Sequence, residues 1–164
     1  MSNLSDLLGG SGGAIELIST TTVSGTPSTI DITSGFSSTY DNYFIYADDV
    51  TLPSSNSFNM RVYKSASLLT SADYSYTTRT GSSQFSQTSF EIAYYESTAG
   101  SAGFRVEIVN VNSSAFAISS NSLFRAVING YNYSGSGSVT GVRIYPASGN
   151  FTAGSFRLYG IKKS

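Results

Sequence analysis

From residue 14 onward, apolar and polar residues alternate with a period of two, and the apolar positions are rich in β-branched and aromatic side chains. The clearest case is Ser57–Lys64, where Phe58, Met60 and Val62 alternate with more polar residues, so we expect these three side chains to point inward. The same pattern predicts ten strands, at Ile15–Val23, Thr29–Thr33, Tyr43–Val50, Ser57–Lys64, Asp73–Arg79, Ser89–Tyr95, Phe104–Val111, Phe124–Tyr133, Val139–Tyr145 and Ser155–Lys162.

Clusters of Gly, Pro, Ser and Asn separate these segments, for example at 81–84 and 112–114, and they predict turns. No convincing helical pattern follows residue 13. Short strands joined by turns are typical of an antiparallel sandwich or barrel. The strand count exceeds that of a seven-stranded immunoglobulin domain, and Cys and Trp are both absent. We therefore expect an all-β, antiparallel, two-sheet, jelly-roll-like sandwich over residues 14–164.

The last predicted strand has two occupied faces. Phe156 and Leu158 fall on one face, whereas Arg157, Tyr159 and Ile161 fall on the other. A strand with both faces occupied is expected deep in a sheet or covered by a neighbour.

Residues 1–13 differ from the rest of the chain. Leu4, Leu7 and Leu8 have the i, i+3, i+4 spacing of a short amphipathic helix, and a Gly- and Ser-rich linker follows them at 9–13. Two interpretations stay open: a disordered terminus, or a short N-terminal arm that docks the three leucines on a capsid protein or a neighbouring subunit.

Histidine and cysteine are both absent from the 164 residues. The chain therefore lacks the commonest general base, a thiolate nucleophile and the usual ligands of zinc. Nine Lys and Arg residues are scattered against ten Asp and Glu, without a basic stripe, and no apolar run is long enough to span a membrane. From this composition we predict no cofactor, no nucleic-acid or membrane partner, and no enzymatic activity.

Two groups of acidic residues are candidate chemical sites. Asp41, Asp48 and Asp49 lie near one predicted strand, but their spacing matches no calcium-binding loop. Glu91 and Glu96 could be the carboxylate pair of a glycoside hydrolase, but nothing in the sequence places them across a cleft. We therefore predict neither a metal site nor catalytic residues.

Twelve tyrosines without a single tryptophan are unusual. Tyrosine rings can close the edges of a thin core, fill subunit interfaces or stack on sugars, while the hydroxyl finds a polar partner. The candidate interface aromatics are Tyr94, Tyr95, Tyr131, Tyr133 and Tyr159.

Three stretches carry a resemblance to a known group of proteins. They are IELISTTTVSGTPS at 15–28, IDITSGFSSTYDNY at 30–43 and VRIYPASGNFTAGSFRLYGIK at 142–162. Together they resemble small jelly-roll β-sandwich virion proteins of tailed bacteriophages, particularly phages of aquatic bacteria. The likeness covers both ends of the domain, and the middle, from 64 to 122, does not match.

The resemblance implies a virion structural protein that is made in the host cytoplasm and has no active-site residues or cofactor. It favours a capsid decoration or cement protein, which would bind the major capsid protein and assemble with itself as a homotrimer on the capsid surface. The alternative is a tail or fibre component that binds a host surface glycan or receptor, although the chain lacks the repeats or coiled coil of a fibre shaft.

Overall fold

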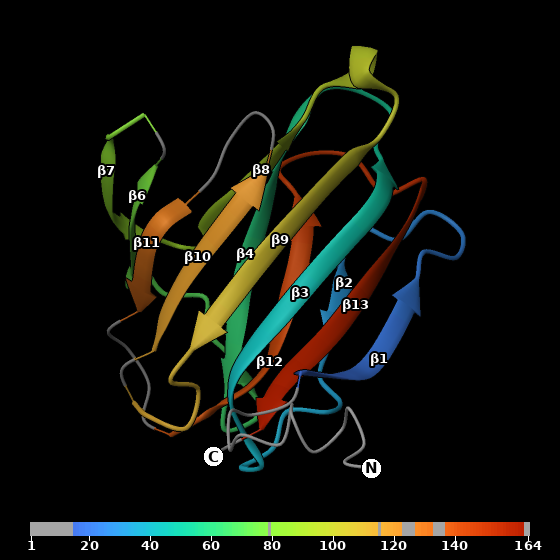
Figure 1. Ribbon diagram of the computed structural model, residues 1–164. Coiled ribbons are helices and arrows are strands. Elements are labelled where there is room, and N and C mark those ends of the chain that lie inside the picture. The colour runs from blue at the N-terminus through green and yellow to red at the C-terminus, as the bar shows by residue number, and fades with distance from the viewer. Residues whose placement is uncertain (1–14, 79, 115, 123–126, 133–136, 163–164) are drawn as a thin grey trace, which may run out of the picture.

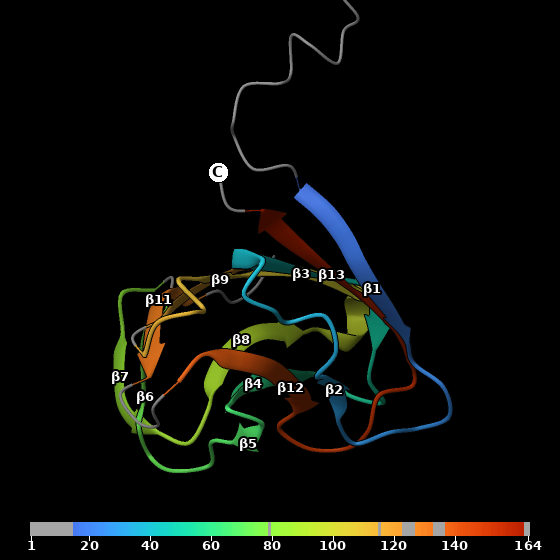
Figure 2. The same ribbon diagram turned by 90° about the horizontal axis from the view of Figure 1, so that it is seen from below.

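A computed structural model describes residues 15–78, 80–114, 116–122, 127–132 and 137–162. Within them, thirteen strands form two antiparallel sheets that pack face to face (Figure 1, Figure 2). The predicted all-β, two-sheet sandwich is therefore confirmed. The predicted arm at 1–13 lies outside the described residues.

The large sheet has eight strands. Their order across the sheet is β1 (Ile15–Thr22), β13 (Ala153–Lys162), β3 (Tyr40–Thr51), β9 (Ala102–Val109), β10 (Ala117–Ser122), β11 (Val127–Asn132), β6 (Tyr74–Thr78) and β7 (Ser83–Gln87).

The small sheet covers the inner face of the large one, as Figure 2 shows from below. Its order is β2 (Ile30–Ile32), β12 (Val139–Pro146), β4 (Asn56–Lys64) and β5 (Ser67–Leu68), with β8 (Phe90–Tyr95) also paired to β4. A single 3₁₀ turn, η1 (Ser97–Ala99), is the only helical element in the described ranges, and these ranges contain no helix that is long and apolar enough to cross a membrane.

The core lies between the two sheets. Phe58, Met60 and Val62 of β4 are fully buried, as the alternation predicts. Aromatic rings connect the layers, because Phe58 of the small sheet lies 5.1 Å from Phe104 of the large sheet and 6.1 Å from Phe151, measured between ring centroids. A continuous aromatic and aliphatic interior of this kind stabilises the sandwich without disulfides.

Three short strands, β5, β7 and β10, were not predicted. The segment of β10, AISSNS, is mostly polar, and its pattern resembles that of a loop. It forms a strand because β9 pairs with it along its whole length and β11 pairs with its beginning. The start of β7 falls in a segment in which Gly81 and two serines predicted a turn.

The last described strand, β13, lies between β1 and β3 and is therefore inside the sheet, as expected for a strand with two occupied faces. Phe156 and Leu158 are buried in the core, and Arg157, Tyr159 and Ile161 lie on the outer face. Both predicted faces are therefore confirmed.

Candidate functional site

The outer face of the large sheet gathers aromatic and charged side chains from strands that are far apart in the sequence. Since Tyr43, Ile45 and Ala47 of β3 point into the core, Phe44 and Tyr46 point outward. The antiparallel register of β3 and β13 sets Tyr159 opposite Phe44, and Arg157 opposite Tyr46. On the other side, β9 sets Glu107 opposite Phe44 and Arg105 opposite Tyr46.

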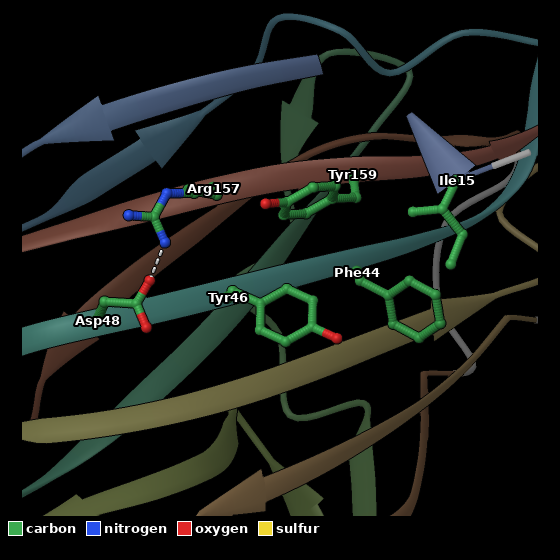
Figure 3. A pocket seen from close by; sticks show the side chains of 6 residues that line it. All are labelled: Ile15, Phe44, Tyr46, Asp48, Arg157 and Tyr159. Carbon is green, nitrogen blue, oxygen red and sulfur yellow. Dashed lines mark hydrogen bonds and ion pairs between the residues drawn. The ribbon is translucent and has the colours of Figure 1, made fainter. Parts of the chain in front are cut away.

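These side chains enclose a shallow groove of about 330 Å³, which we call the outer groove. Figure 3 shows the six residues that line it: Ile15, Phe44, Tyr46, Asp48, Arg157 and Tyr159. The Tyr46 and Tyr159 rings meet edge to face, with centroids 5.5 Å apart and planes at 80°. The Phe44 ring lies 6.4 Å from that of Tyr46. The three rings therefore form one apolar cluster that is open to solvent, with Tyr46 38% exposed.

One end of the outer groove is polar. Arg157 Nη1 donates to Asp48 Oδ2, and Figure 3 shows this ion pair beyond the tyrosines. Both side chains are partly exposed, so the pair adds little to stability and keeps hydrogen-bonding positions that face water.

Asp48 keeps the alternation of Phe44 and Tyr46 and pairs with Ser155 of β13, but β3 becomes irregular at this point. The register with β9 shifts between Ala47 and Val50, and Asp49 within this bulge has a φ of 51°. Opposite it, Gly154 has a φ of 129°, and a Cβ there would lie 2.8 Å from Val50 Cα. The close approach of the two strands at the bulge therefore requires glycine in β13.

A second hollow, of about 320 Å³, lies on the small sheet and is lined by Thr33, Tyr63, Ala66 and Thr140. Beside it, Arg143 binds Asp31 through two hydrogen bonds of 2.7 Å, and Arg143 Nη2 also donates to the Tyr63 hydroxyl at 3.0 Å. Hydrogen bonds from the guanidinium hold the pKa of Asp31 below its ordinary value, and burial raises the pKa of Tyr63. This network joins β2, β12 and β4, so we assign it a structural role.

The four predicted interface aromatics within the described residues do not form one surface. Tyr159 lines the outer groove, Tyr131 of β11 is exposed, and Tyr133 lies outside the described residues, as do Leu4, Leu7 and Leu8.

Tyr94 and Tyr95 lie on opposite sides of β8. Ile92 is an extra residue there, because Phe58 pairs with Ala93 whereas Asn59 pairs with Glu91. This bulge reverses the alternation, so Tyr94 points outward while Tyr95 is buried and donates to the carbonyl oxygen of Gly100 at 3.3 Å. Tyr95 is thus part of the core and is not available for a surface contact.

The acidic candidates have separate partners. Asp48 binds Arg157, Asp49 accepts a hydrogen bond from Ser101, and Asp41 accepts one from Asn112. In the part of the chain that the structure describes, no three potential metal ligands of the Asp, Glu, His and Cys types come together.

The two glutamates each accept a hydrogen bond from a serine of the β4 region. Ser57 Oγ donates to Glu91 at 2.6 Å, and Ser55 Oγ donates to Glu96 at 2.7 Å.

Neither a protein-family profile nor a curated protein sequence matches this chain. Among solved structures, an exo-inulinase from Aspergillus awamori is similar with a TM-score of 0.52 and 11% identity, over 93% of this chain and 31% of the inulinase. The GH43 protein BlXynB from Bacillus licheniformis has a TM-score of 0.33 and 11% identity, over 73% of this chain and 27% of that one. An endo-β-1,4-glucuronan lyase from Trichoderma reesei has a TM-score of 0.35 and 9% identity, over 92% of this chain and 79% of that one.

The prediction of no enzymatic activity is corrected by the first of these likenesses. A sandwich similar to this one is part of an exo-inulinase chain, so this fold does occur in an enzyme. At 11% identity the likeness concerns the fold alone, and it assigns this chain neither an activity nor a substrate.

The sequence did not indicate the outer groove as a site. From the sequence, Tyr159 is a candidate interface aromatic, and Asp48 is a candidate only for calcium binding. The sequence places Arg157 on one face of its strand without a role, and it gives Phe44 and Tyr46 no role. The signal that could have found them is that the outward positions of both β3 and β13 combine aromatic residues with a charged one.

Proposed function

We propose that this chain is a structural subunit of a bacteriophage virion, and that it is a capsid decoration or cement protein which binds the shell of the major capsid protein. The resemblance of 15–28, 30–43 and 142–162 to phage virion sandwiches supports the class. The observation that carries the attachment role is the edge strand β1, on which Ile15 is 64% exposed and Leu17 52% exposed.

An edge strand with exposed apolar side chains is a ready contact surface, because its backbone can also pair with another chain. The start of β1 is fixed to the sheet by Glu16, which accepts hydrogen bonds from Lys162 at 3.0 Å and from the Tyr40 hydroxyl at 2.8 Å. These hydrogen bonds hold the pKa of Glu16 below its ordinary value. Ile15 and Leu17 are therefore presented in a defined orientation, directly after the leucine-bearing segment at 1–13.

In this proposal, the arm and the exposed side of β1 together contact a capsid subunit or another copy of this chain. Leu4, Leu7 and Leu8 would extend the apolar surface that begins at Leu17. Such a contact across a seam between capsid subunits is how a small decoration protein stabilises a shell, and a homotrimer would repeat it around an axis.

The test is occupancy on purified capsids. We expect deletion of residues 1–13, and separately Leu17→Ser, to lower the number of bound copies per capsid. Phe85→Ser is the matched control, because Phe85 is 64% exposed on β7 at the opposite edge of the same sheet. Equal occupancy of all variants would contradict attachment through β1, and electron microscopy that finds the protein only on the tail would contradict decoration.

The second candidate function is a tail or fibre component that binds a host surface glycan or receptor. The observation that favours it is the outer groove with its cluster of three rings, of which Tyr46 is exposed and Phe44 and Tyr159 are partly exposed. We expect the isolated protein to adsorb to host cells and to block infection in this case. Infection that proceeds unchanged at a high protein concentration would exclude receptor binding.

A further inference from the structure

We propose that the outer groove is a saccharide-binding site that takes one neutral pyranose unit, with the aromatic cluster stacking on the sugar and the Arg157–Asp48 pair binding its hydroxyl groups. This inference goes beyond attachment to a capsid and deepens the second candidate function; because Ile15 belongs both to the proposed attachment surface and to the outer groove, it is tested on the isolated protein. It rests on the geometry of six side chains and on the charge balance around them.

The aromatic cluster matches the apolar side of a sugar ring. A pyranose presents a patch of C–H groups on one face, and an exposed aromatic ring gives that patch a flat apolar partner. Figure 3 shows the Tyr46 ring face-on between Phe44 and the Arg157–Asp48 pair. Tyr159 stands at 80° to Tyr46, so it forms a side wall rather than a second layer. A ligand on Tyr46 would therefore contact two rings at once, which fixes its position as well as adding buried apolar area.

The polar end of the outer groove places hydrogen-bond donors of Arg157 next to hydrogen-bond acceptors of Asp48. After the bond between Arg157 Nη1 and Asp48 Oδ2, the guanidinium retains further N–H donors and the carboxylate retains further acceptor positions. Neighbouring hydroxyls of a sugar each donate and accept, so one can bind the carboxylate while the next accepts from the guanidinium. Both groups are charged, which strengthens such hydrogen bonds. Both are also partly exposed, so the sugar hydroxyls would take the place of water molecules and would not have to break contacts within the protein.

The charge of the site favours a neutral saccharide over an anionic one. The cation of Arg157 is matched by Asp48, and across the sheet Arg105 and Glu107 face Tyr46 and Phe44 respectively. Arg105 lies over the Phe44 ring, with its guanidinium carbon 5.4 Å from the centroid. No excess of positive charge remains along the lining for a uronate or a phosphate.

The size of the outer groove also selects the ligand. Its volume of about 330 Å³ is at the lower end of the range for small-molecule sites, roughly 300–1,000 Å³. One sugar ring of about twelve heavy atoms, bound at the efficiency usual for drug-sized ligands, gives a Kd on the order of 1 mM. A single site is therefore weak, and useful binding needs several copies acting on one glycan.

The test is a titration of the purified full-length protein, followed by ¹H–¹⁵N NMR, with glucose, galactose, mannose and glucuronate in turn. We expect at least one neutral hexose to shift the signals of Tyr46 and Tyr159, with a Kd on the order of 1 mM. Tyr46→Ala should raise that Kd about tenfold or more, because it removes the stacking surface. Tyr131→Ala is the matched control, since Tyr131 is also 38% exposed on the same sheet but does not line the outer groove, and it should bind as the parent protein does.

Both variants replace exposed side chains, so their melting temperatures check that a loss of binding is not a loss of fold. The proposal is overturned if no neutral hexose shifts the outer-groove signals at about a hundred times the expected Kd, or if Tyr46→Ala binds as well as Tyr131→Ala. It is also overturned if only glucuronate binds, because the site would then recognise charge. Binding that occurs without adsorption to host cells supports the site while removing the receptor function, so the two are tested separately.

Discussion

Replacing Tyr74 by phenylalanine removes one hydroxyl group and leaves two backbone groups without their partner. Tyr74 belongs to β6 of the large sheet and is fully buried. Its hydroxyl accepts from the backbone N–H of Val62 at 3.1 Å and donates to the carbonyl oxygen of Leu69 at 2.9 Å. One side chain therefore connects the large sheet to β4 of the small sheet and to the residue that follows β5.

The magnitude follows from what the substitution keeps. Phenylalanine retains the ring and its edge-to-face contact with Phe90, at 4.8 Å between centroids, so no large cavity forms. The N–H of Val62 stays buried without an acceptor, and an unsatisfied buried group costs about 1–3 kcal/mol. The Leu69 carbonyl is only partly buried, so water can replace part of its loss. We expect the free energy of unfolding to fall by about 2 kcal/mol, which lowers the melting temperature by about 4–8 °C in a chain of this size.

Urea unfolding at neutral pH and differential scanning calorimetry measure both quantities. Tyr159→Phe is the control, because the Tyr159 hydroxyl has no hydrogen bond to another described side chain or backbone group, and it should change stability by less than about 0.5 kcal/mol. A Tyr74→Phe protein as stable as Tyr159→Phe would refute the reasoning that this hydroxyl satisfies buried backbone groups.

Alkaline pH tests the same residue independently. Burial raises the pKa of Tyr74 to about 12 from an ordinary value of 10.0. As the pH rises, the unfolded chain loses the Tyr74 hydroxyl proton before the folded chain does. The contribution of this hydroxyl to the free energy of unfolding is therefore fully present below pH 10 and is lost as the pH rises through about 12. We expect Tyr74→Phe to lack this part of the alkaline destabilisation, and an unfolding free energy that falls equally steeply in both proteins would contradict the assignment.

Two further predictions concern other parts of the sandwich. Hydrogen bonds from Arg143 lower the pKa of Asp31, so this pair stabilises the protein fully above the ordinary carboxyl pKa of 3.8, and the stabilisation is lost as the pH falls through the lower pKa of the folded state. Arg143→Met should therefore raise the pKa of Asp31 in an NMR titration, and an unchanged pKa would contradict the pairing. Gly130→Ala would place a Cβ 2.9 Å from a ring carbon of Phe90, so it should lower the free energy of unfolding in urea by about 1–3 kcal/mol. Gly103→Ala is the control and should be tolerated, because the nearest atom to its Cβ would be 3.6 Å away. Equal stability of the two variants would show that the core can make room for a methyl group at Gly130.

Local alternation was enough to predict the strands whose one buried face is apolar. Phe58 to Val62 and Phe156 to Leu158 satisfy this condition, and their faces were predicted correctly. The strand β10 does not satisfy it: one of its faces is buried, but two of the three residues on that face, Ser120 and Ser122, are polar, and its pairing with β9 and β11 identifies it as a strand. Tyr95 was placed on the surface because a bulge at Ile92 depends on how β8 pairs with β4, which no local pattern reveals.

The outer groove required knowledge of pairing for the same reason. Phe44 and Tyr159 are separated by more than a hundred residues, and they meet only because β13 pairs with β3 in one register. A shift of one residue would turn Tyr159 inward and Leu158 outward, so burial of Leu158 and Phe156 fixes the register and thereby assembles the groove. The aromatic residues were visible in the sequence, but their common location was not.

The position of β13 also constrains how the molecule can be made. During synthesis β1 emerges first and β3 soon after, but the strand that joins them emerges only when residues 153–162 have been added. Until then both strands have unpaired edges, and pairing between such distant segments is slow because a long loop must close. A nascent or truncated chain that lacks β13 would therefore leave β1 without a partner strand and expose the edge of β3, and we expect it to aggregate rather than to fold into a smaller sandwich.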